Sequence, residues 1–227
     1  MRAISGFLLL VFVVRLCAEE PIEPKFILKD PIVKPDDEDA VKAYRIGTAM
    51  LQEDRALEAS KYLLRAIELE PTFVDAIDHL GVAYRKLNMY DKAEEVYKQS
   101  IKINPENVVP RLNLALLYQL SGRLNESIQA YEEVSRLAPD DPEPYYGIGS
   151  VYQSQSDYNR SITYFDAAIA RYAATKSDLI YDAYMNQAEN HYQLKSYEKT
   201  LEFCKEINRR YPIEPYCLDR IKELEAR

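Results

Sequence analysis

A repeat of 34 residues constrains this fold more than any other feature of the sequence. Small residues, bulky residues and prolines each recur at that spacing, in five registers that keep the same phase. A repeat of this length is typical of chains in which one small structural unit stacks on the next. The recurring positions, register by register, are Gly47, Gly81, Ala115 and Gly149; Met50, Tyr84, Tyr118 and Tyr152; Ala59, Ala93, Ser127 and Ser161; Leu63, Tyr97, Tyr131 and Phe165; and Pro71, Pro105 and Pro139.

Each unit is predicted to be a pair of amphipathic helices. In the second unit Ile77, Leu80 and Tyr84 recur at steps of three and four, which places them on one helical face. The small residue within that face, Gly81, lets the next helix approach closely. Tyr97 then fills the space beside this contact. One such pair cannot bury its apolar face alone, so neighbouring pairs must stack.

The ends of the helices are also marked in the sequence. Asn88 and Gly122 stand where a first helix must stop, and both residue types tolerate the left-handed conformation of a helix C-terminus. The recurring prolines end each second helix and give the chain a fixed direction into the next unit. The sequence therefore predicts short helices that alternate with tight turns.

These registers resemble the tetratricopeptide repeat (TPR) family, and the resemblance extends over residues 40–213. It implies an all-α, right-handed α-solenoid of about five helix-turn-helix units. The fifth unit resumes with an offset of 39 residues at Ala188, and "AATKSD" is expected to lengthen the connection before it. A capping helix is expected at 214–227, where it covers the open end of the solenoid. The expected unit boundaries are 40–73, 74–107, 108–141, 142–180 and 181–213.

Composition excludes several classes of function. The chain has 227 residues and a formal net charge of −8, and it has no basic stripe, which argues against nucleic-acid binding. Its two histidines, His79 and His191, lie too far apart in sequence for a metal motif, and no nucleophile–base pattern accompanies them. We therefore expect no enzyme activity, no metal and no cofactor.

The first 39 residues differ from the rest. Residues 1–18 have a positive start, an apolar run and a small residue at Ala18, which is the layout of a secretory signal peptide. Cys17 leaves a lipoprotein open, and a retained anchor is the third alternative; the protein would meet a membrane only in those two cases. Residues 19–39 form an acidic tether with four prolines. We expect an exported protein, periplasmic or secreted.

The resemblance also implies a concave wall built from the first helices. The matching positions lack the lysine, asparagine and arginine clamp with which some TPR domains hold a terminal carboxylate, so the wall should prefer an apolar or weakly basic peptide or helix. Its expected residues are Tyr44, Thr48, Asp75, Asp78, His79, Val82, Arg85, Leu112, Leu116, Tyr146, Gln153 and Met185.

The two cysteines near the C-terminus allow two predictions. Cys204 lies in the second helix of the fifth unit, and Cys217 lies in the first turn of the capping helix. Because an oxidising compartment permits disulfides and this junction can bring the two residues together, a bond between them is one prediction. Two buried thiols are the other.

Two functions from different classes remain. The favoured hypothesis is an exported scaffold that binds another protein or peptide of the cell envelope in its groove, in envelope assembly. The ending "RRYP" supports it, because this ending resembles a TPR variant common in bacterial envelope proteins. The alternative is a transporter-associated protein, or one that binds a small apolar ligand.

Overall fold

The structure is a computed structural model, and it describes residues 37–212 and 215–226. All regular structure in this part of the chain is helical, which confirms the all-α prediction. The eleven helices of the described part are α1 (Glu38–Gln52), α2 (Ala56–Leu69), α3 (Val74–Lys86), α4 (Tyr90–Ile103), α5 (Val108–Leu120), α6 (Leu124–Leu137), α7 (Glu143–Ser154), α8 (Tyr158–Thr175), α9 (Ile180–Gln193), α10 (Tyr197–Arg210) and α11 (Pro215–Glu225).

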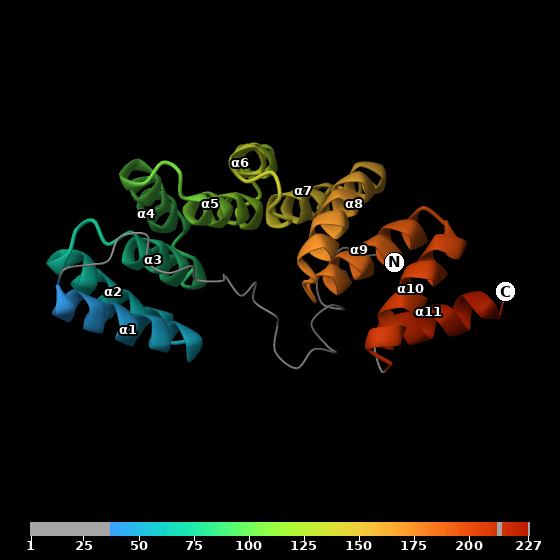
Figure 1. The fold of residues 1–227 in the computed structure, drawn as a ribbon, viewed down its shortest axis with the longest axis horizontal. Coiled ribbons are helices and arrows are strands. Elements are labelled where there is room, and N and C mark those ends of the chain that lie inside the picture. The colour runs from blue at the N-terminus through green and yellow to red at the C-terminus, as the bar shows by residue number, and fades with distance from the viewer. Residues whose placement is uncertain (1–36, 213–214, 227) are drawn as a thin grey trace, which may run out of the picture.

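The helices form a curved solenoid of five pairs followed by a terminal helix (Figure 1). Each odd-numbered helix from α1 to α7 contacts the next odd-numbered helix, whereas no even-numbered helix contacts another closely. The odd-numbered helices therefore converge and the even-numbered helices spread apart. As a result α3, α5, α7 and α9 line the inner side of the arch in Figure 1, and α4 and α6 lie on its outer side.

The small residues of the repeat hold the two helices of each pair together. A Cβ added to Gly81 would lie 2.6 Å from Cζ of Tyr97, which is closer than real Cβ contacts allow. At the partner position on the second helix, the Ser127 hydroxyl donates to the Ala115 carbonyl at 2.8 Å. Ser161 makes the same bond to Gly149 at 2.8 Å. The predicted close approach is thus confirmed, and a hydroxyl satisfies a carbonyl at the contact.

Turns within the pairs are left-handed, as expected. Asn88 and Gly122 have φ values of 57° and 78°. Helices α2, α4 and α6 each end two residues before their proline. The fourth pair differs, because no proline stops α8. The inserted residues extend this helix to Thr175, and Lys176 then ends it with a φ of 54°. The insertion therefore lengthens the helix itself, and not only the connection that we expected.

The C-terminal helix α11 packs on α10, so it takes the place that the first helix of a sixth unit would occupy. Its side chains also reach α9, since the Tyr216 hydroxyl donates to Glu189 at 2.6 Å and Tyr192 donates to Glu223 at 3.1 Å. Cys217 and Leu224 on α11 are buried. This helix covers apolar surface of the fifth pair.

The predicted disulfide is not present. Cys204 and Cys217 belong to one buried cluster, but they remain thiols. The reason is the rotational setting of α11, which directs Sγ of Cys217 to Sδ of Met185 at 3.8 Å. The alternative prediction, two buried thiols, is the one that agrees with the structure.

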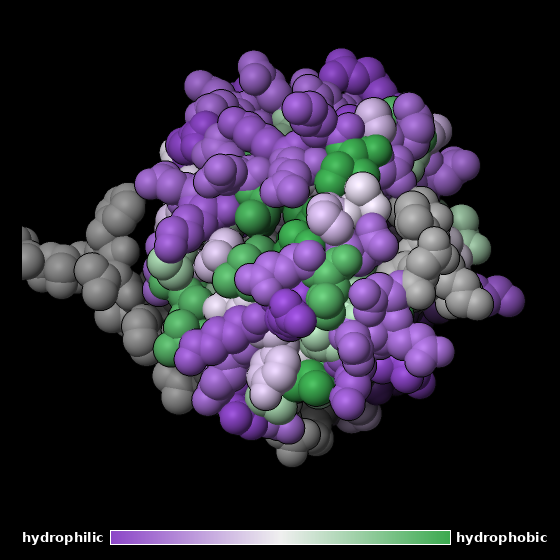
Figure 2. All heavy atoms as spheres, turned by 90° about the vertical axis from the view of Figure 1, so that its left-hand side faces the viewer, coloured by the Kyte–Doolittle hydropathy of each residue, from purple (hydrophilic) through white to green (hydrophobic). Residues whose placement is uncertain are grey.

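At the N-terminal end, α1 begins at Glu38 inside the segment predicted as a tether. Asp37 caps the helix by accepting from the amides of Asp39 and Ala40, and the acidic first turn suits the helix dipole. The predicted signal peptide and residues 19–36 of the tether lie outside the described residues. Figure 2 shows hydrophobic side chains among hydrophilic ones on this end, and Leu57 on α2 is 60% exposed.

Candidate functional site: a pocket in the concave wall

A hollow in the concave wall lies among α5, α7 and α9. It has a volume of about 280 Å³. Leu112 and Leu116 line it from α5, and Tyr146 lines it from α7. All three are half-buried residues that the sequence analysis assigned to the groove. The other lining residues are Gln119, Tyr131, Glu143, Gly147, Ser150, Tyr172, Leu179 and Asp182.

Two carboxyl groups give this pocket its charge. Glu143 accepts a hydrogen bond from the Tyr172 hydroxyl at 2.8 Å, and burial raises its pKa. Burial also raises the pKa of Asp182 on α9. The two carboxyl groups lie near enough for Asp182 to raise the pKa of Glu143 further. Neither forms an ion pair within 37–212 and 215–226. The pocket is therefore apolar on its walls and acidic at one side.

Tyr131 enters the pocket from a second helix, α6. Its ring lies against Gly147, where a Cβ would be 2.6 Å from Cε2 of the tyrosine. The side chain is only 6% exposed, and its hydroxyl makes no hydrogen bond in the described structure. Burial raises its pKa, so the hydroxyl keeps its proton. A buried hydroxyl that opens into a pocket is available to a ligand.

Tyr44, Asp75 and His79 lie together at the α1–α3 end of the concave wall. The Tyr44 ring lies 5.3 Å from that of His79 and 4.8 Å from that of Phe73. Nδ1 of His79 donates to the Asp75 carbonyl at 2.7 Å, and burial lowers its pKa, so the neutral form is favoured. Burial raises the pKa of the Asp75 carboxyl. The histidine serves packing here.

Two predicted groove residues are more buried than the sequence suggested. Asp78 is only 4% exposed; its Oδ2 accepts from the Asn107 amide at 3.2 Å, and its Oδ1 has no hydrogen bond of good geometry. Burial, with a contribution from Asp75, raises its pKa to about 7. Arg85 is half-buried, and its Nε is buried without a partner. Asp78 therefore ties α3 to the next unit, and its side chain offers little surface to the groove.

The remaining predicted positions serve contacts within the protein. Nε2 of Gln153 donates to Asn190 at 2.9 Å and so joins α7 to α9. Met185 packs in the C-terminal cluster with Cys217, because its side chain turns towards α11. Val82 packs against the core of the first two pairs, and the Thr48 hydroxyl donates to its own helix at Arg45. The predicted wall is thus only partly open to a partner.

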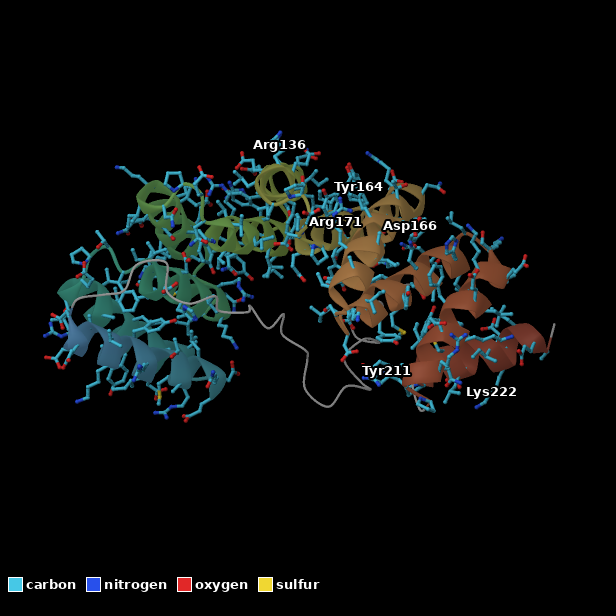
Figure 3. The ribbon with its side chains drawn as sticks, in the orientation of Figure 1. Arg136, Tyr164, Asp166, Arg171, Tyr211 and Lys222 are labelled. Carbon is cyan, nitrogen blue, oxygen red and sulfur yellow. The ribbon has the colours of Figure 1, made fainter. Side chains whose placement is uncertain are left out.

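The outer side of the solenoid differs in its electrostatics. Arg123 forms ion pairs with Glu94 and Glu126, and Lys98 pairs with Glu94 at 2.6 Å. These partners lower the pKa of Glu94 to about 2. Figure 3 shows Arg136 and Tyr164 on this outer side, away from the hollow of the arch. Glu94 and Glu126 are neutralised by basic side chains of the protein, whereas Glu143 and Asp182 in the pocket form no ion pair among the described residues.

The acidic side of the pocket and its two tyrosines from second helices, Tyr131 and Tyr172, were not predicted from the sequence. Glu143 and Asp182 lie in the first turns of α7 and α9, where acids are usual because of the helix dipole, so their role gave no signal. Tyr131 and Tyr172 carry the bulky pattern of a core residue. The one available signal was Gly147, because a glycine at this position leaves room for a large side chain from the preceding helix.

Within the described ranges, no group of three or more His, Cys, Asp or Glu side chains is placed to hold a metal ion. The helices of that same part of the chain include none that is long and apolar enough to cross a bilayer.

Comparisons with known families agree with the architecture. Two models described as tetratricopeptide repeat match residues 85–148 and 146–215, which together span more than half of the chain. No curated protein sequence matches the chain.

Solved structures with the same fold share little sequence with this chain. A TPR protein from Thermus thermophilus, TTC0263, has a TM-score of 0.63 and 16% identity; the match covers 83% of this chain and 100% of that one. PilF of Pseudomonas aeruginosa has a TM-score of 0.66 and 16% identity, over 84% and 92% of the two chains. A chain of the APC/C Cut9–Hcn1 hetero-tetramer has a TM-score of 0.69 and 18% identity. That match covers 82% of this chain but only 36% of the other.

Proposed function

Because this chain belongs to the tetratricopeptide repeat family, we propose that it is a scaffold whose concave wall binds a protein or peptide partner. Members of this family are generally interaction scaffolds. The observation that carries the proposal is the pocket among α5, α7 and α9, where Leu112, Leu116 and Tyr146 present half-buried apolar surface on the inner side. Apolar and aromatic side chains of this kind act as binding anchors once a partner excludes water from them.

The partner is another protein or peptide of the cell envelope, and the compartment is outside the cytoplasm. The signal-like layout of residues 1–18 supports export. The ending "RRYP" supports a part in envelope assembly through its resemblance to envelope TPR proteins. We place the protein in the periplasm or among secreted proteins on these two grounds.

Binding, and not catalysis, is the function that the site chemistry supports. His79 is the imidazole that was predicted for the concave wall, and its Nδ1 is committed to a backbone carbonyl. A small apolar ligand is disfavoured because the pocket, at about 280 Å³, is below the usual range of roughly 300–1,000 Å³ for such sites. It also contains two carboxyl groups, whose burial beside an apolar molecule would be unfavourable.

A site-directed crosslinking experiment tests the proposal. A photo-crosslinking amino acid placed at Leu112 in the full chain, expressed in an exporting host, should join a partner that mass spectrometry identifies. Leu116→Glu should remove this product while circular dichroism shows unchanged helicity, because a charge enters the apolar contact. Leu57→Glu is the matched control, since Leu57 is 60% exposed on α2. Crosslinks from Leu57 with none from Leu112 would move the binding surface elsewhere.

A further inference from the structure

We infer that the pocket among α5, α7 and α9 receives a lysine or arginine side chain of the partner. The aliphatic stem of that lysine or arginine lies along Leu112 and Leu116. Its cationic head group lies between Asp182, Glu143 and the hydroxyl of Tyr131. The inference rests on the proposed function and deepens it, because it states the chemistry by which the groove selects a partner.

The first observation is that Asp182 has no partner for its charge. Its carboxylate makes neither a hydrogen bond nor an ion pair within the described ranges, although the residue is half-buried. In the described part of the chain, the Glu143 carboxylate accepts one hydrogen bond, from Tyr172, and forms no ion pair. A carboxylate that loses water without gaining a partner is costly, and a cation from outside offsets that cost. Occupation by a basic group therefore satisfies both acids.

The second observation is independent of charge. The Tyr131 hydroxyl belongs to a side chain that is 6% exposed, and it opens into the same pocket without a hydrogen bond. As an acceptor it can take an N–H from an ammonium or guanidinium group. Gly147 fixes the position of this ring, because any side chain at that position would overlap it. The hydroxyl therefore has a fixed position and has no hydrogen-bond partner among the described residues.

The charges that surround the pocket agree with a cationic occupant. Asp141 and Asp182 both act on Glu143 and raise its pKa, and Asp182 also acts on the ring hydroxyls of Tyr146 and Tyr172. Arg85 on α3 is the cation that acts on Tyr131, but it forms no ion pair with Glu143 or Asp182. Acids therefore dominate the α7–α9 side, where the head group is expected.

The size of the pocket fits one long side chain. At about 280 Å³ it lies just below the range of drug-sized sites, which is roughly 300–1,000 Å³. Lysine and arginine bury their methylene stems along apolar surface while the charged end reaches polar groups. Leu112, Leu116 and the ring of Tyr146 supply that apolar surface, and Asp182 and Glu143 supply the polar end.

Peptides of one sequence with a variable centre test the inference. The probes are fluorescein-labelled nonapeptides with a central arginine, glutamine or glutamate between leucine and phenylalanine, measured by anisotropy against the full chain. The arginine peptide should bind at least about tenfold more tightly than the glutamine peptide, and the glutamate peptide should bind least, because like charges meet. Equal affinities for the three peptides would overturn the inference.

Two variants locate the effect. Asp182→Asn should weaken the arginine peptide about five- to tenfold and leave the glutamine peptide unchanged, because only the charge pair is lost. Tyr131→Phe, which removes one oxygen, should weaken the arginine peptide a few-fold without changing the melting temperature. Asp91→Asn on α4 is the matched control for the first change, since Asp91 is exposed and does not line the pocket.

The outcomes separate this inference from the proposed function. If Leu116→Glu removes the crosslinked partner but Asp182→Asn alters neither the partner nor the arginine peptide, the groove binds and the basic side chain does not enter it. If neither Leu116 nor Asp182 matters, the concave wall is not the binding surface. Loss of the crosslinked partner in Leu116→Glu together with weaker binding of the arginine peptide in Asp182→Asn, with normal circular dichroism spectra, supports both.

Discussion

Tyr131 on α6 and Gly147 on α7 are a matched pair: the tyrosine ring occupies the space that any side chain at position 147 would need. A Cβ there would lie 2.6 Å from Cε2 of the ring. The contact joins the third and fourth helix pairs, and it also directs the Tyr131 hydroxyl into the concave pocket. Packing between the two units and the chemistry of the pocket therefore both depend on Gly147 having no side chain.

Gly147→Ala should lower both stability and binding. The added methyl group overlaps a ring that is 6% exposed, and overpacking of this kind typically costs about 1–3 kcal/mol. Chemical denaturation should show the lower free energy of unfolding, and Leu112 crosslinking should weaken. In the double variant Gly147→Ala/Tyr131→Leu the two effects should fail to add, since the smaller side chain relieves the overlap. Full additivity would contradict the contact.

Asp78→Asn should change how stability depends on pH. The folded pKa of Asp78 is about 7, above its ordinary value of 3.8. Between these values the folded protein retains a proton that the unfolded chain releases, so stability falls as pH rises from about 4 to about 7. The variant lacks this loss and should be the more stable one near pH 8, by about 1–3 kcal/mol.

The measurement for Asp78 is a difference between two proteins. Urea denaturation at pH 5, 6, 7 and 8 gives the stability of each. The contributions of Glu143 and Asp182 cancel in the comparison, whereas the interaction of Asp75 with Asp78 is part of the measured difference. His79 and His191, whose pKa values are lowered by burial, act in the opposite direction below about pH 6.5 and cancel as well. Parallel pH profiles for the two proteins would show that Asp78 is not titrating.

Cys204 and Cys217 should react as thiols once the chain unfolds. Both are buried in the cluster between α10 and α11, so an alkylating reagent should label them slowly in the native protein and fully in urea without a reductant. Mass spectrometry of the two cysteine peptides measures this. Resistance to labelling in urea, lost on adding a reductant, would show that a disulfide forms.

Removal of α11 should weaken the fifth helix pair and leave the first three pairs intact. A chain that stops after Pro212 uncovers Cys204 and loses the bonds from Tyr216 to Glu189 and from Tyr192 to Glu223. Because stability in a solenoid passes mainly between neighbours, hydrogen exchange should rise in α9 and α10 but not in α1–α6. Leu224→Ala should give a smaller change in the same helices.

The sequence alone determined the repeating parts of this protein. A 34-residue period with small residues such as Gly81 opposite large ones such as Tyr97 can be satisfied only by paired helices that approach closely, and left-handed turns follow at Asn88 and Gly122. These features are local, or they link residues 16 apart within one unit. Periodicity therefore predicted the solenoid, its helix pairs and the terminal helix.

The tertiary structure alone decided which groups remain open to a partner. Leu112, Leu116, Tyr146, Tyr131 and Asp182 come from four helices in three units, and the angle between neighbouring units sets whether they meet. That angle depends on the packing of many side chains together, and no single repeated position in the sequence predicts it. For the same reason Asp78 became buried and Cys217 turned to Met185, since each outcome depends on how the neighbouring helices pack.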